Sequence, residues 1–290
     1  MFKSIMVTTD LSEASDHVVG CLAAFRALGV ERVILLHCLG IRHLQDIKHL
    51  LTPIVEPKLQ EQRAAIEKQG YQVSVEIAPG LPQYEINRVA AEKGCSLVIV
   101  GSHGQTMSSE IHLGGVASEL IHNAKKPVLL VRLKITDVKD RDRCEVICDN
   151  MMEHILYPTD FSDNAERAFT YVKELVQSGV KHVTLLHVQD KVRIGKHLEH
   201  RLEEFNRIDH ERLDQMKSAL SRSGGAEVET AIVYGMPVSE ILKKARENGV
   251  TLIVMGSQGR GYISELFLGS VSHNVARNSE VSVLLIPAKR

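Results

Sequence analysis

Glycine and serine recur at one spacing in the stretch GSQGRGYISELFLGS, residues 256–270. Gly256 directly follows the apolar run TLIVM, and Gly269 and Ser270 open the helical stretch SVSHNVARN. The first backbone N–H groups of a helix have no partner within the helix, and the helix dipole attracts negative charge there. Glycines lack a Cβ and let the backbone approach a phosphate closely. The stretch is therefore typical of an anion-binding loop between a strand and a helix.

The spacing excludes the two best-known phosphate loops. The pattern is G-x2-G-x9-G-[ST], which contains neither the P-loop signature G-x4-G-K-[ST] nor a G-x-G-x2-G after the first strand. A purely structural turn remains an alternative interpretation of the glycines. Asp160, in YPTDFS, comes just before a helical pattern, where it can bind a ligand, cap the helix, or do both.

The chain contains the same domain twice, because a second glycine stretch, GSHGQTMSSEIHLGG, occupies residues 101–115. Four more segments recur in the same order: VTTDLSE as YPTDFSD, VILLHC as VTLLHV, GLP as GMP, and KPVLLV as VSVLLI. A short net insertion in the second copy lies between residues 188 and 235. We predict one domain over 1–135, a charged linker over 136–150, and a second domain over 151–290.

Apolar runs of strand length alternate with helical patterns in both copies. The predicted strands are residues 3–7, 32–37, 73–77, 96–100 and 127–131, and then 154–157, 182–188, 227–233, 251–255 and 281–286. Their nearly continuous apolar character is typical of strands buried on both faces. Right-handed crossovers then place helices on both faces of an open parallel sheet. The predicted fold class is α/β, with two similar five-stranded domains.

The composition is that of an ordinary water-soluble protein. The chain has 290 residues, of which 44% are hydrophobic and 24% charged, and its formal net charge is −1. No basic excess favours nucleic acid, and no apolar run is long enough for a membrane span. We read the start, MFKSIMVTTD, as a first strand rather than a signal peptide. These features predict a cytoplasmic protein without nucleic-acid or membrane partners.

The five cysteines are scattered and odd in number, which favours free thiols in a reducing compartment over a disulfide framework. Cys144 and Cys148 form C-x3-C in the linker, and a redox switch is the alternative to two free thiols. His37 and His187 end the runs VILLH and VTLLH, and we interpret them as hydrogen-bonded core residues rather than metal ligands. The charged stretch KHLEHRLEEFNRIDHERL is interpreted as a helix with a solvated face.

The glycine spacing and its surroundings make the chain resemble a tandem of two universal stress protein domains. The pattern of that family's nucleotide-binding members is met in full by Gly256, Gly259, Gly269 and Ser270. An Asp after the first strand and an LLHV segment at the end of the second are also present. The resemblance implies the strand order 3-2-1-4-5 and a bound ATP or AMP.

The resemblance assigns a role to each part of the second copy. It implies that Asp160 binds the ribose hydroxyls, that the backbone of Val188 reads the adenine edge, and that Ser270 with its neighbours binds the phosphates. The candidate nucleotide-binding residues are Pro158, Thr159, Asp160, Val188, Met255, Gly256, Gly259, Arg260, Gly269, Ser270, Val271 and Ser272.

The first copy departs from this pattern. Gly115 and Ala117 stand where the second copy has hydroxyl residues, and Cys38 replaces a valine, whereas Asp10 is retained. A hydrogen bond to a charged group contributes about 1.5–3 kcal/mol, so we expect a weaker site, suited to fewer phosphates. Its candidate residues are Thr8, Thr9, Asp10, Cys38, Val100, Gly101, Gly104, Gly114, Gly115 and Val116.

The expected function is that of an adenine-nucleotide-binding regulator of a stress response, without a dedicated catalytic reaction or a metal site. Neither glycine stretch contains a lysine, and one carboxylate is thin support for Mg²⁺-assisted hydrolysis; Mg²⁺ could accompany bound phosphates. A slow ATPase or phosphoryl-transfer enzyme and an interaction module with vestigial loops remain alternatives. The resemblance also implies an intrachain pseudo-dimer through KPVLLV and VSVLLI, and pairing of whole chains into a homodimer is a further option.

Overall fold

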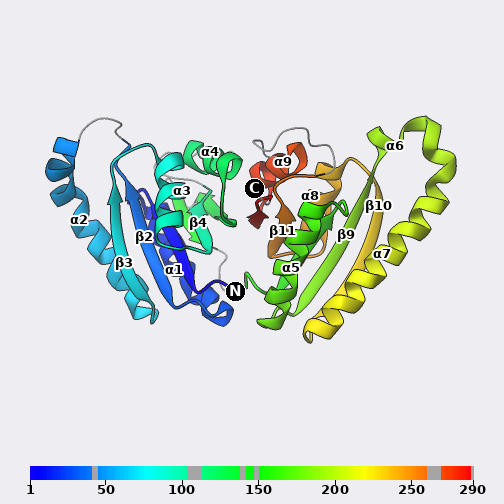
Figure 1. Cartoon of the computed structure of the whole chain (residues 1–290), viewed down its shortest axis with the longest axis horizontal. Coiled ribbons are helices and arrows are strands. Elements are labelled where there is room, and N and C mark those ends of the chain that lie inside the picture. Colours follow the sequence, from blue (N-terminus) through cyan, green and yellow to red (C-terminus); the bar gives the residue numbers. More distant parts are fainter. Residues whose placement is uncertain (41–44, 103–112, 138–141, 147–149, 260–268, 289–290) are drawn as a thin grey trace. The chain divides into compact units, whose positions relative to one another are not determined.

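The computed structural model describes the chain except residues 41–44, 103–112, 138–141, 147–149, 260–268 and 289–290. Only the backbone is described at residues 45–50, 133–137, 142–146 and 196–199. The chain divides into two compact units, unit 1 over Met1–Asp149 and unit 2 over Asn150–Arg290. Figure 1 colours them from blue to green and from green to red.

Unit 1 is an open parallel sheet with helices on both faces. Its elements are β1 Ser4–Thr9, α1 Glu13–Gly20, the 3₁₀ helix η1 Cys21–Leu28, β2 Arg32–Cys38, α2 Gln45–Lys68, β3 Gln72–Ala78, α3 Pro82–Glu92, β4 Leu97–Gly101, α4 Gly115–Asn123 and β5 Val128–Val131. Strand β1 pairs in parallel with β2 and β4, β2 pairs with β3, and β4 pairs with β5. The order 3-2-1-4-5 is therefore confirmed for this unit.

Unit 2 repeats the same topology. Its elements are β8 His154–Thr159, α5 Asp163–Gln177, β9 His182–Asp190, α6 Lys191–Leu198, the 3₁₀ turn η2 Glu199–Arg201, α7 Leu202–Ser223, β10 Glu227–Gly235, α8 Pro237–Glu247, β11 Leu252–Gly256, α9 Ser270–Asn278 and β12 Ser282–Ile286. The parallel order is β10-β9-β8-β11-β12. Helices α5 and α7 pack together, as do α8 and α9 (Figure 1). This pairing is expected, because right-handed crossovers that run from the central strand toward opposite edges of the sheet place their helices on opposite faces.

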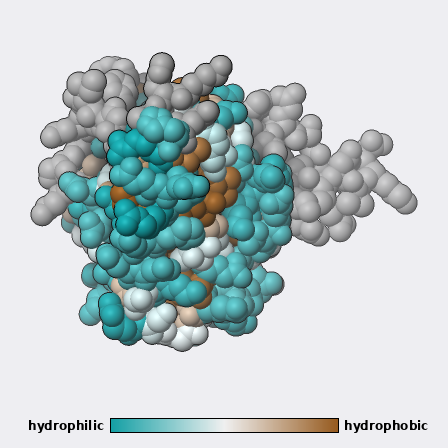
Figure 2. Space-filling model, turned by 90° about the vertical axis from the view of Figure 1, so that its right-hand side faces the viewer, coloured by the Kyte–Doolittle hydropathy of each residue, from teal (hydrophilic) through white to brown (hydrophobic). Residues whose placement is uncertain are grey.

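Local sequence signals explain where these helices begin and what they bury. Ser162 caps α5 by accepting a hydrogen bond from the Ala165 N–H. The helix buries one apolar face, made by Ala165, Phe169, Val172 and Val176. Pro237 occupies the first turn of α8, and Gly249 follows its end with φ of 59°. Helix α7 turns Leu213 and Leu220 into the core. Seen from the side where α7 and β10 lie, the surface is mostly hydrophilic, with one hydrophobic patch near its middle (Figure 2).

Two expectations about the end of unit 1 need correction. The predicted linker over residues 136–150 contains most of an antiparallel hairpin, β6 Leu133–Asp137 paired with β7 Asp142–Val146. A charged two-stranded hairpin shows no apolar period, which is why its sequence resembles a linker. The expectation of free thiols throughout is wrong at Cys21, which is buried and disulfide-bonded. Its partner is not among the described side chains, and Cys38 and Cys95 are free.

No helix in the described part of the chain combines the length and apolar character that a bilayer crossing needs.

In the core of unit 1, a hydrogen bond joins Tyr71 to η1, and substitution of Tyr71 tests its contribution. The buried Tyr71 hydroxyl donates to the Leu22 carbonyl oxygen at 2.6 Å. Tyr71→Phe keeps the ring and removes the donor, so we expect unit 1 to lose about 1 kcal/mol of unfolding free energy. Urea unfolding measures this, with Tyr84→Phe as the matched control because Tyr84 is 63% exposed. Equal effects of the two substitutions would contradict the assignment.

Candidate nucleotide-binding site

A cavity of about 620 Å³ opens at the carboxyl ends of β8, β9 and β11 in unit 2. That size is typical of pockets for nucleotide-sized ligands. Eleven of the twelve candidate residues of the second copy line it: Pro158, Thr159, Asp160, Val188, Met255, Gly256, Gly259, Gly269, Ser270, Val271 and Ser272. Arg260 lies outside the described residues. Segments far apart in the sequence thus share one cavity.

The start of α9 forms one end of this cavity. The first i→i−4 bond of the helix is donated by the His273 N–H to the Gly269 carbonyl, at 2.9 Å. The N–H groups of Ser270, Val271 and Ser272 therefore precede the helical hydrogen-bond ladder, and the positive end of the helix dipole lies among them. This end is chemically suited to an anion such as a phosphate.

Two backbone-directed contacts hold the loop in place before α9. The Gly269 N–H donates to the Ser257 carbonyl at 2.7 Å. The buried Ser272 hydroxyl lies 2.6 Å from that same carbonyl oxygen and 2.9 Å from the Gly269 carbonyl oxygen. Ser272 thus reaches the cavity through its backbone, while its hydroxyl fixes the loop. Ser270 is exposed at the mouth, where its hydroxyl can meet a ligand.

The loop glycines lie close to their neighbours. A Cβ on Gly256 would lie 3.0 Å from the Asn164 carbonyl oxygen and 2.8 Å from its Nδ2. A Cβ on Gly259 would lie 2.6 Å from Oδ2 of Asp160. At Gly269 it would lie 3.3 Å from the backbone of the preceding loop. The backbone of α5 therefore leaves no room for a side chain at Gly256, whereas Gly259 faces the end of a side chain.

Asp160 is oriented by the capping turn of α5. Its Oδ1 accepts hydrogen bonds from the Ser162 N–H at 3.1 Å and from the Ser162 hydroxyl at 2.6 Å. Its Oδ2 faces Gly259, so the carboxylate lies between the end of β8 and the glycine loop. Phe161 takes φ of 57°, a left-handed conformation that is rare for a bulky residue, in the turn that places this carboxylate. The capping and ligand-binding roles are compatible here.

The remaining wall of the cavity comes from β9, α6 and α7. Phe205 and Ile208 of α7 supply apolar surface, and Val188 ends the apolar part of β9. Asp209 of α7 is buried and accepts a hydrogen bond from Gln189 Nε2 at 2.9 Å.

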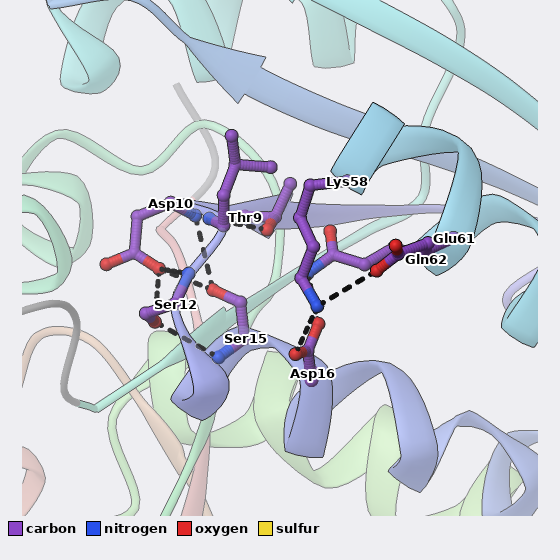
Figure 3. Close-up of polar contacts among 9 residues, drawn as sticks. Thr9, Asp10, Ser12, Ser15, Asp16, Lys58, Glu61 and Gln62 are labelled. Carbon is purple, nitrogen blue, oxygen red and sulfur yellow. Dashed lines mark hydrogen bonds and ion pairs between the residues drawn. The ribbon is translucent and has the colours of Figure 1, made fainter. Parts of the chain in front are cut away.

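The corresponding place in unit 1 carries Asp10. Its Oδ1 accepts from the Ser12 N–H at 3.1 Å, the Ser12 hydroxyl at 2.5 Å and the Ser15 hydroxyl at 2.6 Å (Figure 3). Unit 2 has Ala165 at the position of Ser15, so the two aspartates differ in this one hydroxyl neighbour.

The start of α4 in unit 1 has glycine and alanine, Gly115 and Ala117, where α9 has Ser270 and Ser272. Helix α4 begins at Gly115 after the N-cap Gly114, and the Gly114 N–H donates to the Ser102 carbonyl at 2.9 Å, as in unit 2. Ala117 is buried at the place of Ser272 and has no hydroxyl to fix that carbonyl.

The other candidate residues of unit 1 lie around the same strand ends. Thr8, Thr9, Val100 and Gly101 end β1 and β4, and Val116 is exposed on α4. Cys38 ends β2, and burial raises the pKa of its thiol to about 12, so it stays protonated near neutrality. Gly104 lies outside the described residues.

Comparison with known proteins decides the family. The model of the "Universal stress protein family" matches residues 1–132 and 151–287. The chain belongs to the universal stress protein family. A universal stress protein of Archaeoglobus fulgidus DSM 4304 aligns with a TM-score of 0.74 and 27% identity, over 98% of both chains.

Single-domain relatives align with about half of the chain. "Universal stress protein MJ0577" of Methanocaldococcus jannaschii is 36% identical over 157 residues, which is 48% of this chain and 97% of the relative. "Universal stress protein YxiE" of Bacillus subtilis is 33% identical over 147 residues, covering 47% and 99%. The chain is thus a tandem of two universal stress protein domains.

The contribution of α7 to the cavity wall was not predicted from the sequence of this universal stress protein. The stretch containing Asp209 was interpreted as a solvated face, and the structure buries Asp209 within it. His200 and His210 of the same stretch are exposed, as expected. The only signal in the sequence is that Asp209 lies four residues before Leu213 on the apolar stripe of a helix.

The glycine packing predicts opposite outcomes for two neighbouring substitutions. Gly256→Ala presses a methyl group against the backbone of Asn164, which cannot yield easily, so we expect a loss of about 1–3 kcal/mol of unfolding free energy. Among the described residues, Gly259→Ala meets the end of the Asp160 side chain, which can turn away, so we expect its loss to stay within about 0.5 kcal/mol. Urea unfolding compares them, with Gly115→Ala as control because no atom of the described residues lies within 4 Å of its added Cβ. A larger loss for Gly259→Ala than for Gly256→Ala would contradict this packing.

Proposed function

We propose that the chain is an adenine-nucleotide-binding regulator whose main site is the cavity of unit 2. The observation that carries the proposal is the convergence of three complementary surfaces on that cavity. The N-terminus of α9 offers backbone donors to phosphates, Asp160 offers a carboxylate to ribose hydroxyls, and the wall around Val188 offers apolar surface to a base. A nucleotide has these three parts in this order.

The geometry supports a ligand longer than a single phosphate ion. Asp160 belongs to the turn after β8, whereas Ser270 opens α9 after β11, and both line one cavity. A free phosphate would use only the α9 end and leave the β9 and α7 walls without a role. We therefore propose ATP or AMP as ligand, with Mg²⁺ as a companion of the phosphates.

We propose binding without dedicated turnover. Phosphoryl transfer needs charge stabilisation along the phosphate chain, which P-loop enzymes supply with a lysine next to the phosphates. Neither glycine stretch of this chain contains a lysine. The ligand would then act by changing the conformation or the partner affinity of the protein. Slow hydrolysis of ATP and an interaction module without a ligand are the competing functions.

Matched aspartate substitutions test the proposal. Calorimetric titration of ATP and of AMP into nucleotide-free protein should show two unequal sites. Asp160→Asn removes the charged acceptor for the ribose and should weaken the tighter site about ten-fold, because a hydrogen bond to a charged group is lost. Asp10→Asn should change only the weaker site.

Each contrary result has its own reading. No heat with either nucleotide would sink the nucleotide function and favour the interaction module. Phosphate release from ATP on the timescale of minutes would favour the enzyme instead.

The difference between the two domains predicts a gain of function in unit 1. Gly115→Ser supplies the hydroxyl at the helix start, and in the part of the chain that the structure describes no atom lies within 4 Å of the added Cβ. We expect ATP affinity of the weaker site to rise about ten-fold, since one donor to a charged group is added. Gly115→Ala controls for the backbone effect. Equal affinities of the two variants would show that the missing hydroxyl does not cause the asymmetry.

A further inference from the structure

His187, at the end of β9, lies between two acceptors in the wall of the unit 2 cavity. Its Nδ1 is 2.8 Å from the Thr159 carbonyl oxygen. Its Nε2 is 3.5 Å from Oδ2 of Asp209. Both side chains are buried, with side-chain exposures of 9% for His187 and 12% for Asp209. The imidazole therefore joins the turn after β8 to helix α7.

The two contacts of His187 suit its two protonation states differently. A carbonyl oxygen only accepts, so Nδ1 must carry a proton. A neutral imidazole has one N–H, and its Nε2 would then turn a lone pair toward the Asp209 carboxylate. The imidazolium form gives both nitrogens a proton and pairs its charge with Asp209.

We infer that Asp209 holds His187 in its imidazolium form and is thereby a positioning residue for the nucleotide site of unit 2. The inference rests on the proposed nucleotide-binding function for its effect on the ligand, and on geometry alone for the charge of His187. The held imidazolium donates to the Thr159 carbonyl, which belongs to the peptide that leads into Asp160. Asp209 therefore acts on the ribose-binding carboxylate through His187.

Aromatic packing supports the same turn. The Phe161 ring lies on the His187 ring, with centroids 4.6 Å apart. The Arg212 guanidinium lies 5.1 Å from the centre of the Phe161 ring. Arg212 and Asp209 both come from α7. The left-handed residue Phe161 is thus fixed between a strand end and a helix, and Asp160 with it.

The charged groups around His187 decide whether loss of its proton strengthens or weakens the binding of an anionic ligand. Among the described residues, the charged groups that line the same cavity are Asp160, Asp190, Arg193, Asp209 and Arg212. Arg193 lies 3.7 Å from Asp190 and offsets its charge. Loss of the His187 proton leaves Asp209 as an unbalanced negative charge beside the ligand, so binding of an anion weakens.

At the positions that match His187 and Asp209, the sequence of unit 1 has a histidine but no acidic residue. His37 Nδ1 is 2.9 Å from the Thr9 carbonyl oxygen, as in unit 2. Leu39 stands at the position of Gln189. Matching the buried Leu59 of α2 to Leu213 of α7 places Val55 at the position of Asp209. The pair is therefore a feature of unit 2.

The polar residues of α2 serve a different contact. Lys58 Nζ lies 2.8 Å from Asp16 Oδ2, and Gln62 Nε2 donates to Asp16 Oδ1 at 2.7 Å (Figure 3). Asp16 belongs to α1. Helix α2 is thus tied to α1, whereas α7 is tied to the wall of the cavity.

The pH dependence follows from the ion pair. Asp209 lies beside Nε2 and favours the charged form of His187. Nucleotide binding to unit 2 should be strongest where His187 is charged and should weaken as the pH rises and the ring loses a proton. Once His187 is neutral, the unpaired charge of Asp209 beside the ligand should lower ATP affinity about five- to ten-fold.

The test measures His187 without a ligand first. Nitrogen NMR of the nucleotide-free full chain, over about pH 6 to 9, follows the protonation of both ring nitrogens, with His187→Gln used to assign the signal. We expect a doubly protonated ring at neutral pH and, in Asp209→Asn, a fall of the midpoint by about one unit or more. Asp214→Asn removes the same charge from an exposed position of α7 and should leave the midpoint in place.

ATP titrations over the same pH range complete the test. The affinity of the tighter site should fall with rising pH in the native protein and in Asp214→Asn, and the midpoint of that fall should move down in Asp209→Asn. A neutral His187 at neutral pH would overturn the inference, whatever the protein binds. A charged His187 with pH-independent ATP affinity would overturn the positioning role. Absence of any nucleotide binding would refute the proposed function while the NMR result still decides the charge.

Discussion

The site depends on the parallel pairing of β8 with strands on both of its sides. Because β9 and β11 flank β8, the connection after β8 leaves toward one face of the sheet and the connection after β11 toward the other. The two chain segments separate at the carboxyl edge and leave a cavity between them. Everything proposed for ligand binding follows from what lines that cavity, with α9 at one end and the capping turn of α5 at the side.

Two kinds of interaction shape this cavity: close packing at the glycines, and contacts of polar and charged groups. The glycines let α5 and the loop after β11 touch, and the Ser272 hydroxyl fixes the start of α9, so backbone donors are already oriented before a ligand arrives. On the other side, buried polar groups hold the turn that carries Asp160. Unit 1 keeps the fold and the glycine frame, but has Gly115 and Ala117 in place of the α9 hydroxyls and Ser15 in place of Ala165. The two copies therefore share the scaffold and differ in the groups at the proposed ligand site.

Much of this could be predicted from the sequence, because repeats and periodicity report on local structure. The strand runs and the proline and glycine positions at the ends of α8 follow from such patterns, whereas the order 3-2-1-4-5 was implied by the family resemblance. The disulfide at Cys21 and the burial of Asp209 could not be predicted, since both depend on which segments meet in space. In the sequence, Asp209 on a charged helix cannot be distinguished from a solvated residue. The structure shows that the neighbouring strand β9 places His187 beside it. The hairpin β6–β7 was missed for a different reason, because a short charged ladder has no apolar signature.

The most direct measurement is a crystal structure of the full chain grown with ATP. The account predicts a nucleotide in the unit 2 cavity, with its phosphates against the N–H groups of Ser270, Val271 and Ser272 and its ribose on Asp160. A nucleotide bound only in unit 1, or one in unit 2 with its phosphates away from the start of α9, would contradict it.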